Sequence, residues 1–234
     1  METKNTEIIE KVNQVLQKVD KFFHGLEPSL QHAISRDKYF EQHPEITDHK
    51  NFNFSLSGDD IEEKKIPYNV AGCTGRAKLF SKYAREIGLK DFNIVATVKQ
   101  KDLNNKNSDK MIDGHQVIAI KLSDGLHMID PGAGKTYEKA KIEGDCKVGE
   151  NIDAVRNDKK EYVISAILTP AEYDEVKTYE QIKQLYLRVK NKNMQDKYKL
   201  AIENIKNLDQ EAQNQQLQQA VYVNMIKTTA LDTN

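Results

Sequence analysis

Apolar residues recur at helical spacing near the start of the chain. Between residues 5 and 24 each apolar residue has another apolar residue three or four positions away. Because this spacing places them on one face of an α-helix, the segment is predicted to be an amphipathic helix. The polar stretch 41–65, which is interrupted by Pro44 and Gly58, is expected to be irregular.

A second helical stripe begins at Cys73. Its apolar members fall at i, i+4, i+7, i+11 and i+14, and they are Cys73, Ala77, Phe80, Ala84 and Ile87. Gly88 follows directly and can end a helix in the left-handed conformation. The pattern therefore predicts a helix that starts near the cysteine and stops at the glycine.

Alternating apolar positions then predict strands. Residues 92–98 alternate, a polar loop covers 100–114, and residues 162–168 form another apolar run. The runs 115–122 and 126–130 flank Ser123-Asp124-Gly125, which is typical of a hairpin turn.

The rest of the chain has helical propensity. Thr169-Pro170-Ala171-Glu172 combines a capping box with proline at the first helical position. The order of elements predicts an α+β fold with an N-terminal helical segment (1–40), a core (41–169) and a C-terminal helical extension (170–234). The extension could serve as a surface for oligomerisation or for a protein partner.

Composition narrows the function classes. The 234 residues are 38% hydrophobic and 30% charged, and their net charge of -1 provides no basic field for nucleic acid. The N-terminus lacks an apolar signal core, and no apolar run approaches the ~18 residues of a membrane span. With two cysteines and no disulfide framework, we expect a cytoplasmic protein, although export by a signal-independent route stays open.

Cys73 is the candidate nucleophile. The start of a helix stabilises a thiolate through the helix dipole and the unpaired N–H groups, and the same groups can hold an oxyanion close to the sulfur. The alternative is that Cys73 is a small apolar residue on a buried stripe. Cys146 has no histidine nearby in the sequence and is expected to be a bystander.

A nucleophilic thiol needs a base, and the base needs an orienting acceptor. His115 opens its predicted strand, and Asp130 ends the returning strand just before Pro131. His127 alternates away from Asp130 and is expected to have another role. The four histidines in the first fifty residues lie in helical or polar irregular context.

These residues also carry a family resemblance. Residues 72–89 resemble the cysteine helix of the transglutaminase-like superfamily, while Gly114-His115 and Ile129-Asp130-Pro131 resemble its histidine and aspartate motifs. The likeness covers about residues 66 to 135. It implies a papain-like α+β core with Cys73 as nucleophile, His115 as base and Asp130 as orienting acid, without a metal or cofactor.

The resemblance implies acyl transfer from amide bonds of a peptide or protein. Many crosslinking relatives rely on tryptophan near the oxyanion, and this chain has none, so hydrolysis by a peptidase, amidase or glutamine deamidase is favoured. Asn69 or Tyr68, just upstream of Cys73, could supply a side-chain donor to the oxyanion. The alternatives are a protein-glutamine transglutaminase and an inactive transglutaminase-like binding module.

The triad makes a prediction about strand register. A tight Asp124-Gly125 turn would place Asp130 opposite Ala119, about 13 Å along the strand from His115. A hydrogen bond between His115 and Asp130 instead requires Val117 or His115 opposite Asp130. We therefore expect a turn displaced toward Leu122-Ser123-Asp124, or a bulge between Val117 and Met128.

Overall fold

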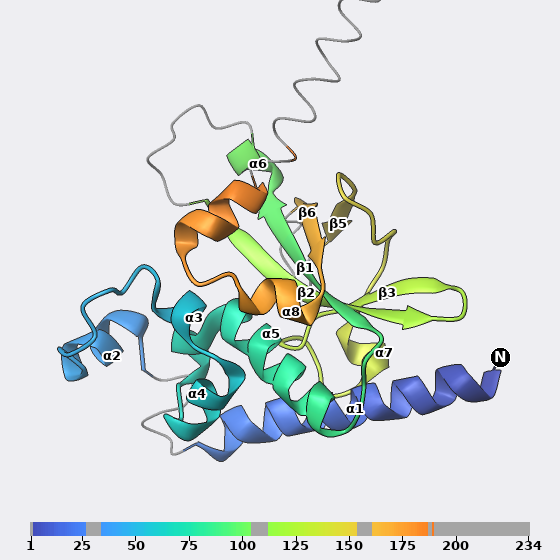
Figure 1. Ribbon diagram of the computed structural model, residues 1–234, viewed down its shortest axis with the longest axis horizontal. Coiled ribbons are helices and arrows are strands. Elements are labelled where there is room, and N and C mark those ends of the chain that lie inside the picture. Colours follow the sequence, from blue (N-terminus) through green and yellow to red (C-terminus); the bar gives the residue numbers. More distant parts are fainter. Residues whose placement is uncertain (1, 27–33, 104–111, 154–160, 187–188, 190–234) are drawn as a thin grey trace, which may run out of the picture. The chain divides into compact units, whose positions relative to one another are not determined.

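The computed structural model describes residues 2–26, 34–103, 112–153, 161–186 and 189. These residues belong to one compact unit, Met1–Val189, while residues 190–234 form a second unit that lies outside the described residues. Among the described helices, none is both long and apolar enough to cross a membrane. Figure 1 shows the helices and the sheet of the first unit.

Two long helices form most of the helical layer. α1 (Glu2–Gly25) contains the predicted amphipathic segment, and α5 (Tyr68–Glu86) contains the Cys73 stripe. Gly88 adopts φ +70 directly after α5, as the sequence predicts. Three shorter helices precede α5, and they are α2 (Arg36–Gln42), α3 (Phe52–Ser55) and α4 (Gly58–Glu63).

The prediction that residues 41–65 are irregular is wrong in part, because α3 and α4 lie inside that stretch. α4 begins at a capping box in which the Ser57 hydroxyl accepts the Asp60 N–H and the Asp60 carboxylate accepts the Ser57 N–H. The sequence prediction overlooked this box.

Six antiparallel strands form one sheet in the order β4-β3-β2-β1-β6-β5. The four predicted strands are confirmed, and they are β1 (Phe92–Lys99), β2 (Gly114–Leu122), β3 (Gly125–Ile129) and β6 (Glu161–Leu168). The short edge strands β4 (Lys141–Ile142) and β5 (Asn151–Asp153) were not predicted. Among the described residues between strands, two short helices occur, α6 (Gln100–Leu103) and α7 (Tyr137–Ala140).

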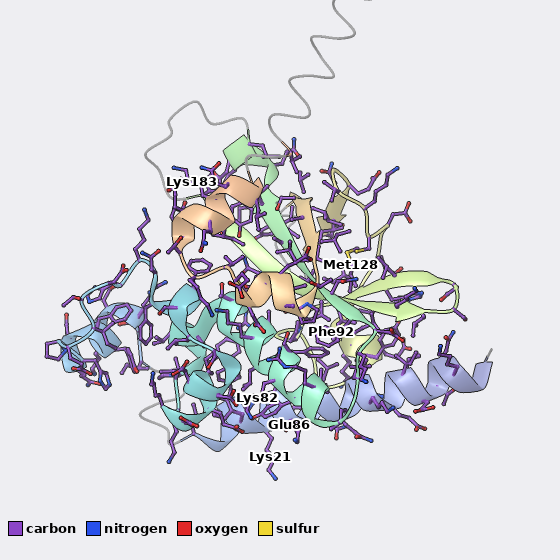
Figure 2. The ribbon with its side chains drawn as sticks, viewed as in Figure 1. Lys21, Lys82, Glu86, Phe92, Met128 and Lys183 are labelled. Atoms are coloured by element: carbon purple, nitrogen blue, oxygen red, sulfur yellow. The ribbon has the colours of Figure 1, made fainter. Side chains whose placement is uncertain are left out.

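The two faces of the sheet bury different clusters. Ile94, Ile118 and Ile120 belong to the larger cluster, which also holds the apolar residues of α1 and α5. Phe92 lies at the start of β1 (Figure 2). Its ring packs edge-on against that of Phe80 of α5, with ring centroids 5.6 Å apart. Side chains from all six strands form the second cluster on the other face, so the sheet curls around them.

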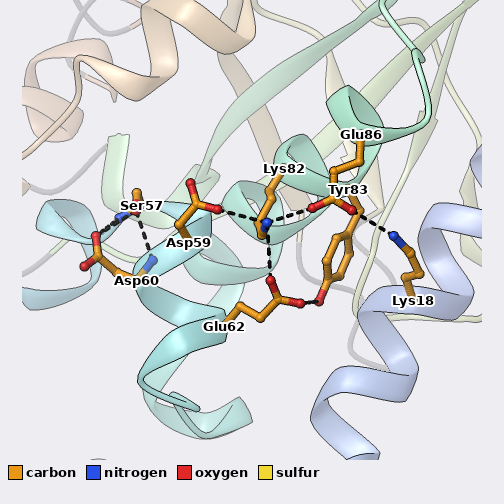
Figure 3. Close-up of polar contacts among 8 residues, drawn as sticks. All are labelled: Lys18, Ser57, Asp59, Asp60, Glu62, Lys82, Tyr83 and Glu86. Atoms are coloured by element: carbon orange, nitrogen blue, oxygen red, sulfur yellow. Dashed lines mark hydrogen bonds and ion pairs between the residues drawn. The ribbon is translucent and has the colours of Figure 1, made fainter.

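Charged side chains tie α4 and α1 to α5. Lys82 of α5 lies within 2.9 Å of Asp59 and 2.7 Å of Glu86, and Glu86 pairs with Lys18 of α1 at 2.8 Å (Figure 3). Because Asp59, Glu86 and Lys18 are exposed to solvent, each pair contributes about 1 kcal/mol or less. The network therefore orders the helices more than it stabilises the core.

A buried lysine holds the chain that precedes α4. Lys78 of α5 is 2% exposed, and its ammonium group donates to the carbonyls of Phe54 and Leu56. Burial lowers the pKa of Lys78 to about 8. This arrangement fixes α3 beside the beginning of α5, where Cys73 lies.

The chain after β6 returns to the core. The predicted capping box at Thr169 begins α8 (Pro170–Asp174), and residues 179–186 are also helical. Tyr173, Tyr179 and Tyr186 from this part are buried in the larger cluster. The sequence placed the start of a C-terminal extension at residue 170, whereas the compact unit continues to Val189.

Candidate active site

Cys73 stands where α5 begins its longer stretch. Gly72 interrupts the helix with φ +61 and ψ -164, a backbone conformation that residues other than glycine rarely adopt. The helical stretch that starts at Cys73 therefore has its own unpaired N–H groups and its own dipole. Both effects stabilise negative charge on the sulfur.

His115 and Asp130 meet at the open end of the β2–β3 hairpin. Leu122 pairs with Gly125, so the turn is Ser123-Asp124, one position before the Asp124-Gly125 turn. Ile118 pairs with Ile129, and one further step along this register places Asp130 opposite Val117. The prediction of a displaced turn is confirmed.

The carboxylate of Asp130 is held from two sides. His115 Nε2 lies 2.8 Å from Oδ2, and the N–H of Gly132 donates to Oδ1 at 2.7 Å. Asp130 is only 4% exposed. Since Nε2 is engaged by Asp130, Nδ1 is the ring nitrogen of His115 that remains for the thiol.

Electrostatics favour a charged pair. Burial would raise the pKa of Cys73, but hydrogen bonding and charge from His115, with the charge of Arg76, lower it below its ordinary value. Burial would lower the pKa of His115, but Asp130 and Cys73 raise it to about 10. Burial opposes ionisation of Asp130 too, yet His115 holds the pKa of that carboxyl below its usual range. These interactions therefore shift the pair toward thiolate and imidazolium.

Gln116 is a site residue that the sequence analysis did not single out. In its neutral form the Cys73 thiol donates to Gln116 Oε1 at 2.7 Å, and Thr74 donates to the same oxygen at 3.2 Å. Gln116 Nε2 donates to the Tyr186 hydroxyl at 2.8 Å. The buried amide thus connects the thiol to the C-terminal helical segment. Gln116 and Tyr186 are 70 positions apart in the sequence, so no local pattern reveals their contact.

Arg76 is a second residue that was not predicted. It lies one helical turn after Cys73, with its guanidinium 4.4 Å from the centroid of the Tyr68 ring. Its positive charge lowers the pKa of both Cys73 and Asp130. The i, i+3 spacing from the cysteine was the signal in the sequence that could have identified it.

The candidate oxyanion donors fall in different places. Asn69 lines the same cavity as Cys73, and its amide donates to the carbonyl of Ile34 at 3.4 Å. Tyr68 lines a separate cavity and packs against Phe23 and Arg76. The structure therefore brings Asn69, but not Tyr68, to the cavity of the thiol.

Asn53 of α3 also lines the Cys73 cavity. Asn53 is 8% exposed, and its Oδ1 has no hydrogen-bond partner among the described residues. Its Nδ2 lies next to Gly72, 3.6 Å from the position that a Cβ on residue 72 would occupy. An amide in this position could donate to an oxyanion formed beside the sulfur. Its distance in sequence from Cys73 hid it from the sequence analysis.

The cavity beside Cys73 measures about 380 Å³. Its apolar wall includes Phe54, Ile112 and Tyr179, and its polar wall includes Gln116. This size lies within the range of small-molecule and side-chain pockets. An extended acyl chain could place its carbonyl at the sulfur while its side chain occupies the cavity.

Cys146 and His127 lie in other settings. Burial raises the pKa of Cys146 to about 11, and this residue packs against the second cluster of the sheet. His127 contacts Asp124 through Nε2 at 2.9 Å and the Tyr137 hydroxyl through Nδ1 at 2.7 Å. Neither environment resembles that of the pair formed by Cys73 and His115.

Comparison with known proteins finds no matching family model, no matching curated protein and no matching solved structure.

Proposed function

We propose that this protein is a cysteine-dependent acyl-transfer enzyme that acts on amide bonds of a peptide or protein. The observation that carries the proposal is the arrangement of thiol, imidazole and carboxylate. Cys73 begins a helical stretch, His115 lowers its pKa, and Asp130 holds the imidazole at 2.8 Å. A buried group of this kind, placed beside a cavity, is typical of nucleophilic catalysis.

The first half of the reaction follows from these positions. With the thiol proton held on His115 Nδ1, the lone pair of the Cys73 sulfur forms a bond to the amide carbonyl carbon. The displaced electron pair rests on the carbonyl oxygen beside the N–H groups at the start of the helix. Collapse breaks the C–N bond, His115 gives its proton to the leaving nitrogen, and a thioester on Cys73 remains.

The second half regenerates the thiol. Water loses a proton to His115 as its oxygen bonds to the thioester carbon, and the C–S bond then breaks. The carboxylic acid leaves, and the proton returns to the sulfur. If a primary amine takes the place of water, the same steps give a new amide.

We favour hydrolysis over amine transfer because the chain contains no tryptophan. Offering a glutamine-containing protein with an excess of a primary amine separates the two, because hydrolysis releases acid while transfer incorporates the amine. Predominant incorporation would replace the hydrolase assignment with the transglutaminase assignment.

The fold also accommodates a protein that only binds peptides. Labelling with a peptide-based electrophile that reacts with activated thiols tests the enzyme against this alternative. We expect labelling of wild type and of Cys146→Ser, and none of Cys73→Ala. Absence of labelling in a folded wild-type protein would favour the inactive binding module.

A further inference from the structure

A second, larger cavity is lined by Arg76 and not by Cys73. It measures about 640 Å³ and lies between α1, α5 and the loop 131–136. It shares no described lining residue with the cavity of Cys73. Phe23 and Val19 provide apolar wall, so a small organic molecule could fill it.

Arg76 stands in the wall of this cavity as an incompletely satisfied cation. Its Nε is buried without a hydrogen-bond partner, and it has no ion-pair partner among the carboxylates that the structure describes. Buried donors are nearly always satisfied in folded proteins, so an unpaired guanidinium nitrogen at a cavity wall needs an explanation.

The guanidinium is held in place before any ligand arrives. The Tyr68 ring covers it at 4.4 Å, and a Cβ on Gly132 would approach Arg76 Nε to 2.7 Å. Glycine at position 132 therefore leaves the room that the guanidinium occupies. A rigidly placed arginine of this kind suits carboxylate and phosphate groups, which accept two parallel hydrogen bonds.

The remaining charges of the cavity leave it positive. Asp20 is the acidic residue among the described lining residues, and it already pairs with Lys135 at 2.8 Å and with His24 at 3.2 Å. Lys139 adds a further cation, for which the described residues provide no ion pair. Among the described lining residues, no carboxylate therefore balances the charges of Arg76 and Lys139; Asp130, whose pKa Arg76 lowers, does not line the cavity.

We propose that this cavity binds a small organic anion through a carboxylate or phosphate group, with Arg76 as its anchor. Lys139 adds charge at the rim, while Phe23 and Val19 contact the apolar part of the ligand. The inference does not depend on the reaction at Cys73, because none of the binding contacts involves the thiol.

Isothermal titration calorimetry on the full chain tests the proposal, with inorganic phosphate in one series and citrate in another, in a chloride buffer. We expect saturable binding of at least one anion. Arg76→Gln should weaken it by at least ~10-fold, as expected when a charge-assisted hydrogen bond is lost. Lys147→Gln, an exposed lysine outside the cavity, should bind as wild type does.

A second variant guards against misfolding of Arg76→Gln. Gly132→Ala keeps every charge but displaces the guanidinium, so it should also weaken binding while circular dichroism remains that of wild type. Absence of saturable binding for both anions at millimolar concentration would overturn the proposal. Equal affinity in wild type and Arg76→Gln would overturn it as well.

Discussion

The two cysteines are chemically unlike at the level of single residues. Charge and hydrogen bonding from His115 lower the pKa of Cys73, whereas burial raises the pKa of Cys146 to about 11. Since the thiolate is the reactive form, the same protein contains an activated thiol and an internal reference thiol.

Limited iodoacetamide treatment at pH 7 should therefore modify Cys73 at least ~10-fold faster than Cys146. Peptide mass spectrometry after short exposure measures both rates in one sample. Equal labelling of the two cysteines would show that His115 does not activate the thiol.

The pH dependence of this alkylation reports on His115. Its raised pKa, about 10, and the lowered pKa of Cys73 both favour the thiolate–imidazolium pair. As pH falls, the rate should stay high below the usual thiol midpoint and drop only at the depressed pKa of Cys73. In His115→Gln the midpoint should rise to ~8.5 or above, the value of a thiol without an ion-pair partner.

His127→Gln is the matched control for that experiment, because His127 contacts Asp124 and Tyr137 rather than Cys73. Its alkylation profile should overlay that of wild type. A midpoint that stays low in His115→Gln would remove His115 as the charge partner of the thiol.

At the level of elements, a single glycine sets the position of Cys73 at the start of its helical stretch. Gly72 has φ +61 and ψ -164, and its substitution by alanine would cost about 1–3 kcal/mol if the backbone kept this conformation. The chain can avoid this cost by continuing the helix through residue 72, which moves the N–H groups away from the sulfur.

Gly72→Ala should therefore slow the alkylation of Cys73. The decrease in rate should exceed that of a variant which loses the same stability elsewhere in the fold. Gly88→Ala provides the comparison, because Gly88 has φ +70, open space around an added Cβ and a cost of about 1–2 kcal/mol. It should lower the thermal midpoint but leave the alkylation rate unchanged. Equal alkylation rates in both variants would contradict the role given to the break at Gly72.

The sequence predicted the elements better than their long-range contacts. The β2–β3 register followed from one requirement, a hydrogen bond between His115 and Asp130, and the Leu122–Gly125 pairing confirms it. α4 was overlooked because its capping box uses Asp60 in place of the usual glutamate or glutamine. Local patterns contain the information for such elements even when a first inspection overlooks it.

Gln116 and Arg76 could not be placed from local patterns. Gln116 contacts Cys73 only because β2 packs against α5, and it contacts Tyr186 only because the C-terminal segment returns to the core. Arg76 is oriented by Tyr68 and Gly132, which are brought together by tertiary packing. Such contacts depend on how elements pack, which periodicity does not encode.

At the scale of the whole molecule, the C-terminal part divides in two. Residues 170–189 belong to the compact unit and bury Tyr173, Tyr186 and Val189, while residues 190–234 form a separate unit. The site depends on the first part, since Tyr186 accepts the hydrogen bond of Gln116.

A chain that ends after Val189 should therefore unfold cooperatively and keep the alkylation rate of Cys73. A chain that ends after Leu168 should lose cooperative unfolding, because it lacks the buried tyrosines. Thermal denaturation followed by circular dichroism compares the two. Loss of folding in the longer chain would show that residues 190–234 are required by the first unit.

The proposed reaction requires that Cys73 forms an acyl-enzyme. Rapid mixing with a p-nitrophenyl ester, acid quenching and intact-protein mass spectrometry measure it directly. We expect a burst of p-nitrophenol with one acyl group on Cys73, present in Cys146→Ser and absent in Cys73→Ala. Steady release without an adduct on Cys73, or a burst that persists in Cys73→Ala, would contradict it.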